Sequence, residues 1–353
     1  MSSSFLLYGS TGFVGKEIAR LAVQRGLQPM LAGRNAAKVE AQAAEFNLEC
    51  RIFGLDDSVT MDKALAEVEV VLHCAGPYIN TYKTMLEGCL RTGTHYLDLT
   101  GEIPVFEALA ACDAQAKSRQ IMLLPGAGFD VVPTDCLALY LKQRLPSATR
   151  LTLAWQSQGP VNAFPPGSAT TMMESIIPYG FKVRRAGQLE PFPRKLKTRL
   201  IDFGLGPVEA TLFPWADVFT AFHSTGIPNI EDYASDISGK VRRQMTSLAK
   251  LRPLFRLTAV RRFLRRRMKV GSTADERGRT CTHVWGEVED DQGRTAVSRL
   301  HGPEGGVVWT SLAALAAVRK VLAGEAPPGF QTPARAYRAD FVLECEGVTR
   351  EDV

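Results

Sequence analysis

Residues 4–25 pass from an apolar segment through a glycine-rich turn into a helical pattern, and no other stretch constrains the fold as strongly. Three glycines in the turn, Gly9, Gly12 and Gly15, recur at intervals of three residues. Such glycines permit a sharp strand-to-helix turn, a close approach of the backbone to a bound group, and tight packing of the helix on the strand. Apolar residues after the turn recur at helical spacing, which indicates a helix lying on a sheet with its N-terminus at the turn.

The start of this helix is a predicted binding site for a phosphate group. The first N–H groups of a helix have no partner within the helix, and together with the helix dipole they attract an anion. A turn that follows a strand and opens a helix is the expected context of a dinucleotide-binding βαβ unit. A purely structural tight turn is the alternative interpretation.

A P-loop is a second alternative, because Gly15-Lys16 resembles the end of that motif. The sequence disagrees with a P-loop at two positions. Ser10 stands where its first glycine belongs, and Glu17 stands where Ser or Thr would hold magnesium. Dinucleotide binding is therefore the favoured interpretation.

The end of the second predicted strand, "LAGRNAAK", indicates which dinucleotide is bound. An enzyme that uses NAD usually carries Asp or Glu there for the ribose 2′-hydroxyl, whereas this chain has Arg34, followed one helical turn later by Lys38. A guanidinium favours a 2′-phosphate, and a carboxylate would repel it. The sequence predicts NADP, with NAD as the alternative if Arg34 is only a solvated loop residue.

The first 145 residues alternate between strand-like and helix-like segments. We expect strands at 4–9, 27–32, 49–55, 68–74, 95–99 and 120–125, and helices near 13–25, 35–46, 61–66, 81–92, 104–118 and 133–144. Strands separated by helices indicate βαβ units and a parallel sheet. The predicted fold class is α/β: a Rossmann doubly wound parallel sheet with a second, mixed α+β domain.

The alternation changes after residue 146, where Pro and Gly become frequent. A strand is expected at 150–157, a hairpin at 279–289 and 294–301, a helix at 305–324 and a last strand near 339–345. We therefore predict a dinucleotide-binding domain at 1–145 and a substrate or lid domain at 146–304. Residues 305–353 would supply a C-terminal helix and strand that pack back on the first domain.

Composition sets the broad class of the protein. The length of 353 residues suggests two domains, or one large domain with an insertion. The composition, 45% hydrophobic and 22% charged, is ordinary for a globular protein. The seven cysteines form no CxxC pair, so a reducing compartment is expected. No basic leader and no window of about 18 apolar residues is evident. We expect a cytoplasmic protein, with peripheral membrane attachment as the alternative.

The basic residues are concentrated in one segment. Residues 240–269 contain twelve Lys or Arg and no Asp or Glu, and Pro253 would divide the segment into two helices. A solvated helix face is one interpretation. Docking to an acidic acyl carrier protein or to anionic lipid is the other. Nucleic acid is not expected, because only Phe255 and Phe263 could stack on bases.

Several catalytic arrangements are missing from the sequence. No tyrosine is followed by Lys four residues later, so the Tyr-xxx-Lys pair of short-chain dehydrogenases is absent. There is no GxSxG elbow for an acyl hydrolase. The five histidines show no HxxxH or HExxH spacing, so no metal site is predicted.

Polar residues near the predicted strand ends are candidates for catalysis. Tyr78, Tyr96, Glu102 and Asp130 would face the crevice where ligands bind a doubly wound sheet. Each could instead be a structural hydrogen-bonding group, and Asp130 could cap the following helix. Asp56 could likewise cap a helix or approach the adenine. Tyr78 is our candidate for proton donation.

Six stretches together resemble one family. They are "YGSTGFVGKEIAR", "LAGRN", "CAGPY", "GTHYLDLTGE", "PGAGFDVVPTDCLA" and "GFQTPA". These stretches are similar to those of the saccharopine dehydrogenase-like oxidoreductases. The similarity covers the first 140 residues well, the last 50 moderately and the middle poorly.

The resemblance implies a Rossmann domain that binds NAD(P) beside a second domain with an open mixed sheet. It implies that the turn holds the pyrophosphate, that Arg34 binds the 2′-phosphate, and that the segment after the fourth strand lines the nicotinamide side. Lys38 is a further candidate from its position in the sequence. The residues concerned in the turn are Gly9, Ser10, Thr11, Gly12, Phe13, Val14 and Gly15. Those after the fourth strand are Ala75, Gly76, Pro77 and Tyr78.

The chain looks most like the branch of this family that includes trans-acting enoyl reductases. The resemblance implies hydride transfer from NADPH to a C=C bond, or to an imine or carbonyl, with a carrier-bound acyl chain as one substrate class. A homodimer is a further expectation. A hypothesis of another class is a non-catalytic NADP-binding adaptor at a lipid or carrier-protein surface.

Overall fold

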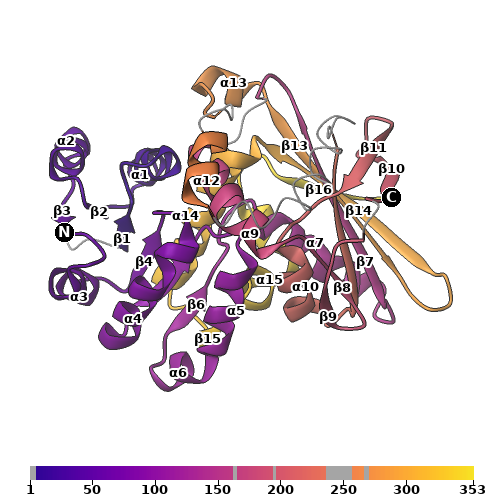
Figure 1. Cartoon of the computed structure of the whole chain (residues 1–353), viewed down its shortest axis with the longest axis horizontal. Helices are drawn as coiled ribbons and strands as arrows, with labels where there is room; N and C mark the ends of the chain where they lie inside the picture. The colour runs from indigo at the N-terminus through magenta and orange to yellow at the C-terminus, as the bar shows by residue number, and fades with distance from the viewer. Residues whose placement is uncertain (1–4, 162–164, 194–195, 236–256, 266–269) are drawn as a thin grey trace. The chain divides into compact units, whose positions relative to one another are not determined.

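The computed structural model describes residues 5–161, 165–193, 196–235, 257–265 and 270–353 (Figure 1). The chain forms two compact units. The first comprises Met1–Phe129 and Thr310–Thr332, and the second comprises Asp130–Trp309 and Pro333–Val353.

The first unit is built on a seven-stranded sheet in which every pair of neighbours is parallel. The strands, in their order across the sheet, are β15 (Gly329–Phe330), β6 (Met122–Leu124), β5 (His95–Asp98), β4 (Val70–His73), β1 (Phe5–Tyr8), β2 (Pro29–Gly33) and β3 (Cys50–Ile52). All residues of β1, β2 and β4 are buried, as a sheet covered on both faces requires. The predicted strands of the Rossmann sheet are confirmed.

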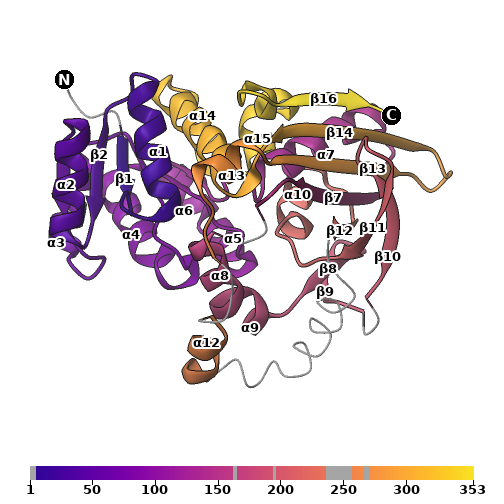
Figure 2. The same ribbon diagram turned by 90° about the horizontal axis from the view of Figure 1, so that it is seen from above.

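Helices connect these strands. They are α1 (Phe13–Gln24), α2 (Ala36–Phe46), α3 (Ser58–Ala66), η1 (Tyr78–Asn80), α4 (Tyr82–Thr92), α5 (Ile103–Ala111), α6 (Asp113–Ser118) and α14 (Thr310–Leu322). The predicted helix at 104–118 is divided into α5 and α6 at Cys112. Helix α1 packs beside α14, and α3 packs beside α4 (Figure 2).

The second unit contains a nine-stranded mixed sheet. Its main path is β10 (Thr198–Asp202), β11 (Pro207–Leu212), β12 (Asn229–Ser235), β7 (Arg150–Gln158), β13 (Cys281–Glu289), β14 (Thr295–Pro303) and β16 (Thr349–Asp352), with β8 (Lys182–Arg185) on β12 and β9 (Gln188–Pro191) on β8. The predicted strand at 150–157 and the predicted hairpin, here β13 and β14, are confirmed.

Helical segments of the second unit flank this sheet. They are α7 (Val132–Arg144), α8 (Pro166–Thr171), η2 (Met172–Ile176), α9 (Ile177–Tyr179), α10 (Asp217–Thr225), α12 (Thr258–Arg265), α13 (Ala274–Gly278), η4 (Gly305–Trp309), α15 (Pro333–Tyr337) and η5 (Ala339–Glu344). The predicted last strand near 339–345 is wrong, because these residues form η5. Hydrogen bonds there join residues three apart, from the Phe341 N–H to Arg338 and from the Cys345 N–H to Val342, as in a 3₁₀ helix.

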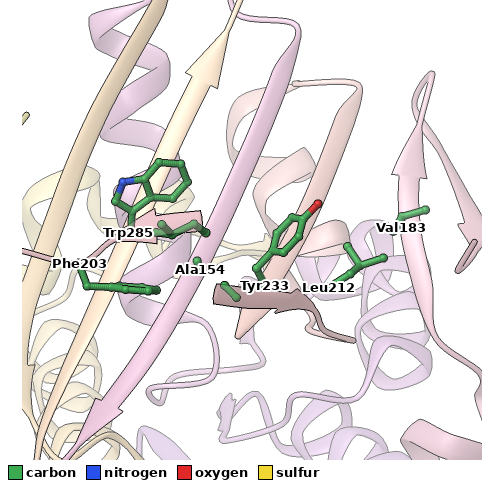
Figure 3. Packing of buried hydrophobic residues seen from close by; sticks show 8 residues of the cluster. Ala154, Val183, Phe203, Leu212, Tyr233 and Trp285 are labelled. Atoms are coloured by element: carbon green, nitrogen blue, oxygen red, sulfur yellow. The ribbon is translucent and has the colours of Figure 1, made fainter. Parts of the chain in front are cut away.

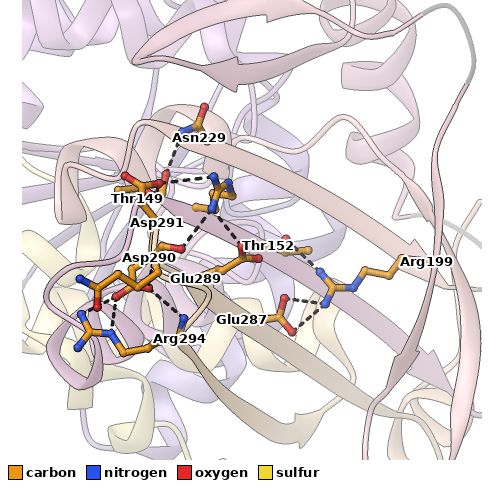
Figure 4. A network of polar contacts seen from close by, with 11 residues as sticks. Thr149, Thr152, Arg199, Asn229, Glu287, Glu289, Asp290, Asp291 and Arg294 are labelled. Atoms are coloured by element: carbon orange, nitrogen blue, oxygen red, sulfur yellow. Dashed lines mark hydrogen bonds and ion pairs between the residues drawn. The ribbon is translucent and has the colours of Figure 1, made fainter.

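The sheet of the second unit curves around an apolar core. Arg199 of β10 reaches Glu287 of β13 with two bonds of 2.6 and 2.7 Å, although three strands separate β10 from β13 (Figure 4). The core inside the curve combines residues of β7, β8, β10, β11, β12 and β13 with Phe203, which follows β10 (Figure 3). Trp285 is its largest member, and the Arg199 guanidinium lies 5.0 Å from the Trp285 ring centroid.

The bounds of the two units differ from the predicted domain boundaries at residues 145 and 304. Helix α7 belongs to the second unit because it packs on β13 and β14. Gly286 makes room for it, since a Cβ there would lie 2.6 Å from Leu141 and 3.1 Å from Leu137. Helix α14 and strand β15 belong to the first unit, whereas residues 333–353 belong to the second.

One segment contradicts the expectation that no stretch is long and apolar enough to span a membrane. Gly305–Leu322 has 18 residues and a mean hydropathy of 1.3, although 67% of it is buried. The core helix of a globular protein has the same length and composition, so this is weak evidence for a membrane span.

The basic segment 240–269 lies mostly outside the described residues. Of its two predicted helices, only part of the second is described, as α12. There Phe263 is 55% exposed, while Leu264 packs on Met173 and Ile177.

Candidate functional site

The glycine-rich turn joins β1 to α1, and its backbone explains two of the glycines. Gly9 has a φ of +85°, and a Cβ there would lie 2.9 Å from the backbone nitrogen of Ala75. At Gly15 a Cβ would lie 2.3 Å from the carbonyl oxygen of Gly9. Only glycine therefore lets the end of β4 and the first turn of α1 approach the same turn so closely.

The N-terminus of α1 is open at the end of this turn. Gly12 is its N-cap, so no side chain caps the helix, and the Gly12 N–H donates to the Gly9 carbonyl at 3.0 Å. Gly12 and Phe13 are exposed, while Thr11 and Val14 are half-buried. An exposed helix start without a side-chain cap suits a phosphate group.

Ser10 differs from the rest of the turn because it is fully buried. Its carbonyl accepts a hydrogen bond of 3.1 Å from the Gln42 side chain. Its hydroxyl has no hydrogen-bond partner among the described residues. Ser10 thus supports the turn from inside and has no exposed side chain to make its predicted contact with a cofactor.

Arg34 and Lys38 lie where the sequence placed them, one after β2 and the other in the first turn of α2. Both side chains are exposed. The Asn35 side chain caps α2 by accepting from the Lys38 N–H at 3.1 Å. The N–H groups of Gly9 and Ser10 donate to the carbonyl of Ala32, two residues before Arg34. Arg34 therefore follows a strand end that contacts the turn, and Lys38 follows Arg34 by about one helical turn.

Asp56 does not cap the helix that follows β3. Asp57 caps α3 instead, because its carboxylate accepts from the Thr60 N–H at 3.1 Å. The Asp56 carboxylate turns back over Gly54, where a Cβ would lie 2.2 Å from its oxygen. The suggested approach of Asp56 to an adenine stays a prediction.

The segment after β4 is held by a carboxylate from a neighbouring strand end. Gly76 and Pro77 are joined by a cis peptide bond, and Tyr78 begins η1. The fully buried Glu102 accepts hydrogen bonds from the Tyr78 N–H at 2.7 Å and the Ile79 N–H at 2.9 Å. Glu102 therefore binds the backbone of the segment that was predicted to line the nicotinamide.

A second group of hydrogen bonds connects the same segment to His73 at the end of β4. The Thr81 hydroxyl donates to the Ala75 carbonyl at 2.9 Å and lies 3.0 Å from His73 Nε2. Burial lowers the pKa of His73 to about 3, so this ring is neutral at physiological pH. The Thr81 hydroxyl also lies 3.3 Å from the Pro77 carbonyl, so Thr81 connects His73 to the backbone of this segment.

Tyr78, the predicted proton donor, lies edge-on to His73 with ring centroids 5.5 Å apart. It is 8% exposed. Burial raises its pKa well above the ordinary value, and the carboxylates of Asp98 and Glu102 add to the rise. The hydroxyl thus keeps its proton at neutral pH, as a donor must, but it is a weak acid. Its catalytic role stays a prediction.

Tyr96 and Asp98 form a buried pair at the end of β5. The Tyr96 hydroxyl donates to Asp98 at 2.6 Å, and Asp98 also accepts from the backbone of Thr100 and Gly126. Burial raises the pKa of Asp98 to about 6, although these hydrogen bonds favour its ionised form. These contacts favour the structural interpretation of Tyr96.

Asp130 begins the second unit, and it is half-buried. It does not cap the following helix, because the N-cap of α7 is Val131 and no side chain caps it. Burial raises the pKa of Asp130 to about 6. In the part of the chain that the structure describes, no group of three or more His, Cys, Asp or Glu side chains could hold a metal ion.

The first unit therefore brings together the open turn, the two cations and the segment 75–78, with Glu102 behind that segment. Sequence reasoning missed three contributors: His73, Thr81 and Asp98. Asp98 could have been found, because it lies in the quoted stretch "YLDLTGE" at a strand end. Nothing in the sequence indicates that Thr81 binds the carbonyl of Ala75.

The first unit also matches a known family in sequence. Residues 5–124 match the family model described as the saccharopine dehydrogenase NADP binding domain. The predicted resemblance to the saccharopine dehydrogenase-like oxidoreductases is confirmed. The description of the family model also agrees with NADP as the predicted cofactor. The parts of Arg34 and Lys38 in binding it stay predictions.

Curated relatives are similar over part of the chain. A protein of Mycobacterium tuberculosis described as a trans-acting enoyl reductase is 34% identical over 158 residues, which are 42% of this chain and 38% of that protein. A trans-acting enoyl reductase of Mycobacterium leprae is 30% identical over 148 residues, 40% of this chain and 35% of that protein. The matched region thus spans well under half of these relatives.

Among solved structures, apo saccharopine dehydrogenase (L-Glu forming) from Saccharomyces cerevisiae has a similar fold. Its TM-score is 0.67 over 99% of this chain and 100% of the yeast chain, at 15% sequence identity. The predicted fold class, a Rossmann sheet with a second mixed domain, is confirmed.

Proposed function

We propose that the chain is an NADPH-dependent reductase that transfers a hydride to an enoyl C=C bond. The observation that carries the proposal is the open N-terminus of α1 beside two exposed cations, within residues that match an NADP-binding family model. NADPH bound there would supply the hydride.

The residues of the first unit fit a dinucleotide with a 2′-phosphate. The backbone of Thr11, Phe13 and Val14 would hold the diphosphate at the helix start, where the dipole favours negative charge. Arg34 and Lys38 would bind the 2′-phosphate, since no acidic group holds either one within the described residues. NAD is the alternative cofactor.

The segment Ala75–Tyr78 would line the nicotinamide side. Tyr78 would supply the proton that complements the hydride, since its hydroxyl belongs to the segment that would line the nicotinamide. The rest of the rate acceleration would come from positioning the two reacting carbons and stabilising an enolate-like charge.

The substrate class is supported by the names of the relatives described above, which are trans-acting enoyl reductases. A carrier-bound acyl chain is the favoured form of the substrate, and an imine or carbonyl compound is the alternative. The proposed partner at residues 240–269 is an acyl carrier protein or an anionic membrane. We also propose a cytoplasmic location and a homodimer.

The test is a screen of NADPH oxidation by the purified chain against enoyl thioesters, amino-acid imines and simple carbonyl compounds. We expect oxidation with an enoyl thioester and a strong loss of turnover in Tyr78→Phe, with NADPH binding retained. Oxidation with imines alone would contradict the enoyl assignment. Binding of NADPH without oxidation of any substrate class would favour the non-catalytic adaptor instead.

A further inference from the structure

The two bonds from Glu102 to the segment after β4 follow from the topology of the first sheet. Strands β4 and β5 are parallel neighbours, and their last residues, His73 and Asp98, are paired in register. The segments that follow the two strands therefore leave the same edge of the sheet side by side. A side chain from one can bind the backbone of the other there.

The turn after β5 directs Glu102 toward its neighbour. Asp98 accepts from the Thr100 N–H at 2.9 Å, and the Thr100 hydroxyl accepts from the Glu102 N–H at 3.1 Å. These two side-chain bonds fix the backbone between the strand end and α5. Glu102 is then the N-cap residue of α5, yet its side chain does not cap that helix.

The Glu102 carboxylate binds the first N–H groups of η1 instead. Hydrogen bonds from backbone N–H groups to an ionised carboxylate are among the strong ones, and two of them fix an orientation as well as a distance. Glu102 is fully buried, so water does not compete for these bonds. Together with Thr81, which holds the Ala75 carbonyl, it fixes both ends of the segment 75–79.

We propose that Glu102 is a positioning residue that holds the segment 75–79 in the shape that receives the nicotinamide ring. This inference rests on the proposed function, because it assigns the nicotinamide side to that segment. It assigns Glu102 to positioning rather than to proton transfer, since both of its oxygens already accept backbone hydrogen bonds. Glu102 acts through the backbone of Tyr78 and Ile79.

The first arm of the test needs no cofactor. Amide hydrogen exchange of the Tyr78 and Ile79 N–H groups is measured in wild type, Glu102→Gln and Glu102→Ala, with Glu87→Gln as a control. Glu87 is an exposed glutamate on α4 of the same unit. Removing the carboxylate should speed exchange of both N–H groups by about tenfold or more. The Gln variant keeps one acceptor, so it should be intermediate, and Glu87→Gln should match wild type.

The second arm compares two ligands by calorimetry. NADPH carries the nicotinamide, whereas 2′-phospho-ADP-ribose lacks it but keeps the diphosphate and the 2′-phosphate. Glu102→Ala should weaken NADPH binding by about tenfold and leave 2′-phospho-ADP-ribose within about twofold of wild type. Thr81→Val should weaken NADPH in the same direction, because it releases the Ala75 carbonyl.

The outcomes separate the inference from the proposed function. Equal loss of both ligands in Glu102→Ala would overturn the positioning role, because a general loss of structure affects both. Unchanged exchange at Tyr78 and Ile79 would overturn it as well. If wild type binds neither ligand, the proposed function fails, and the segment 75–79 then has no nicotinamide ring to receive.

Discussion

Replacing Gly9 with Ala tests whether the turn is built for close approach or only for a left-handed backbone. Gly9 has a φ of +85°, and Gly93, at the end of α4, has a φ of +79°. The two positions differ in what an added Cβ would meet. At Gly9 it would lie 2.9 Å from the backbone of Ala75, whereas nothing lies within 4 Å at Gly93. Gly93→Ala is therefore a matched control within the same unit.

The expected losses of stability follow from the left-handed backbone and from the steric overlap. Both variants place an L-residue in the left-handed region, which costs about 1–2 kcal/mol in the free energy of unfolding. Gly9→Ala adds an overlap with backbone that cannot rotate away, which costs about 1–3 kcal/mol more. We expect a loss of about 1–2 kcal/mol for Gly93→Ala and about 2–5 kcal/mol for Gly9→Ala.

Urea unfolding measures the stability of both variants, and calorimetry measures their affinity for NADPH. The overlap at Gly9 moves the turn or the segment at Ala75, so Gly9→Ala should bind NADPH at least about tenfold more weakly while Gly93→Ala binds as wild type does. Equal losses of stability in the two variants, with equal NADPH affinities, would refute the close-approach argument.

Three further predictions concern charged groups. Arg34→Ala should weaken NADPH by about tenfold or more and NADH hardly at all in calorimetric titrations, because only NADPH carries the 2′-phosphate; equal effects on both would contradict this assignment. Burial raises the pKa of Asp98 from 3.8 to about 6, so between those values the folded chain binds a proton that the unfolded chain does not. The Asp98 contribution to wild-type stability should therefore fall by about 2 kcal/mol as the pH rises from 4 to 6. Urea unfolding of Asp98→Asn should show a shallower fall over this range, and identical slopes would disprove the contribution. Burial and the charge of Asp232 raise the pKa of Asp217 well above its ordinary value, so its burial costs stability above pH 4. The Thr134 hydroxyl donates to Asp217 at 2.7 Å, and Asn would keep an acceptor for this bond. Asp217→Asn should therefore unfold at a higher urea concentration than wild type at pH 7. A lower urea midpoint would argue against the prediction.

The turn and the parallel sheet could be predicted because their determinants are local. Gly9 and Gly15 follow one strand and open one helix, and the burial of β1, β2 and β4 matches their continuous apolar sequence. The residue that caps a helix was harder to predict, because two neighbouring aspartates precede α3 and either could be its N-cap. The sequence does not distinguish Asp56 from Asp57, and in the structure Asp57 caps α3 while the Asp56 carboxylate lies over Gly54.

Contacts between distant segments could not be predicted. Helix α7 continues the alternation of the first 145 residues, yet it packs on β13, where Gly286 admits Leu137 and Leu141. Glu102 was predicted at a strand end, but its bonds to Tyr78 and Ile79 depend on the register of β4 with β5. A single sequence does not reveal that register.

The central claim is that a diphosphate binds the N-terminus of α1 with the 2′-phosphate at Arg34. Amide hydrogen exchange of the full chain, measured with and without NADPH, tests it most directly. We predict slower exchange in residues 9–16 and 34–38 when NADPH is present, with little change in β16 of the second unit. Protection confined to the second unit, or no protection at saturating NADPH, would contradict the claim.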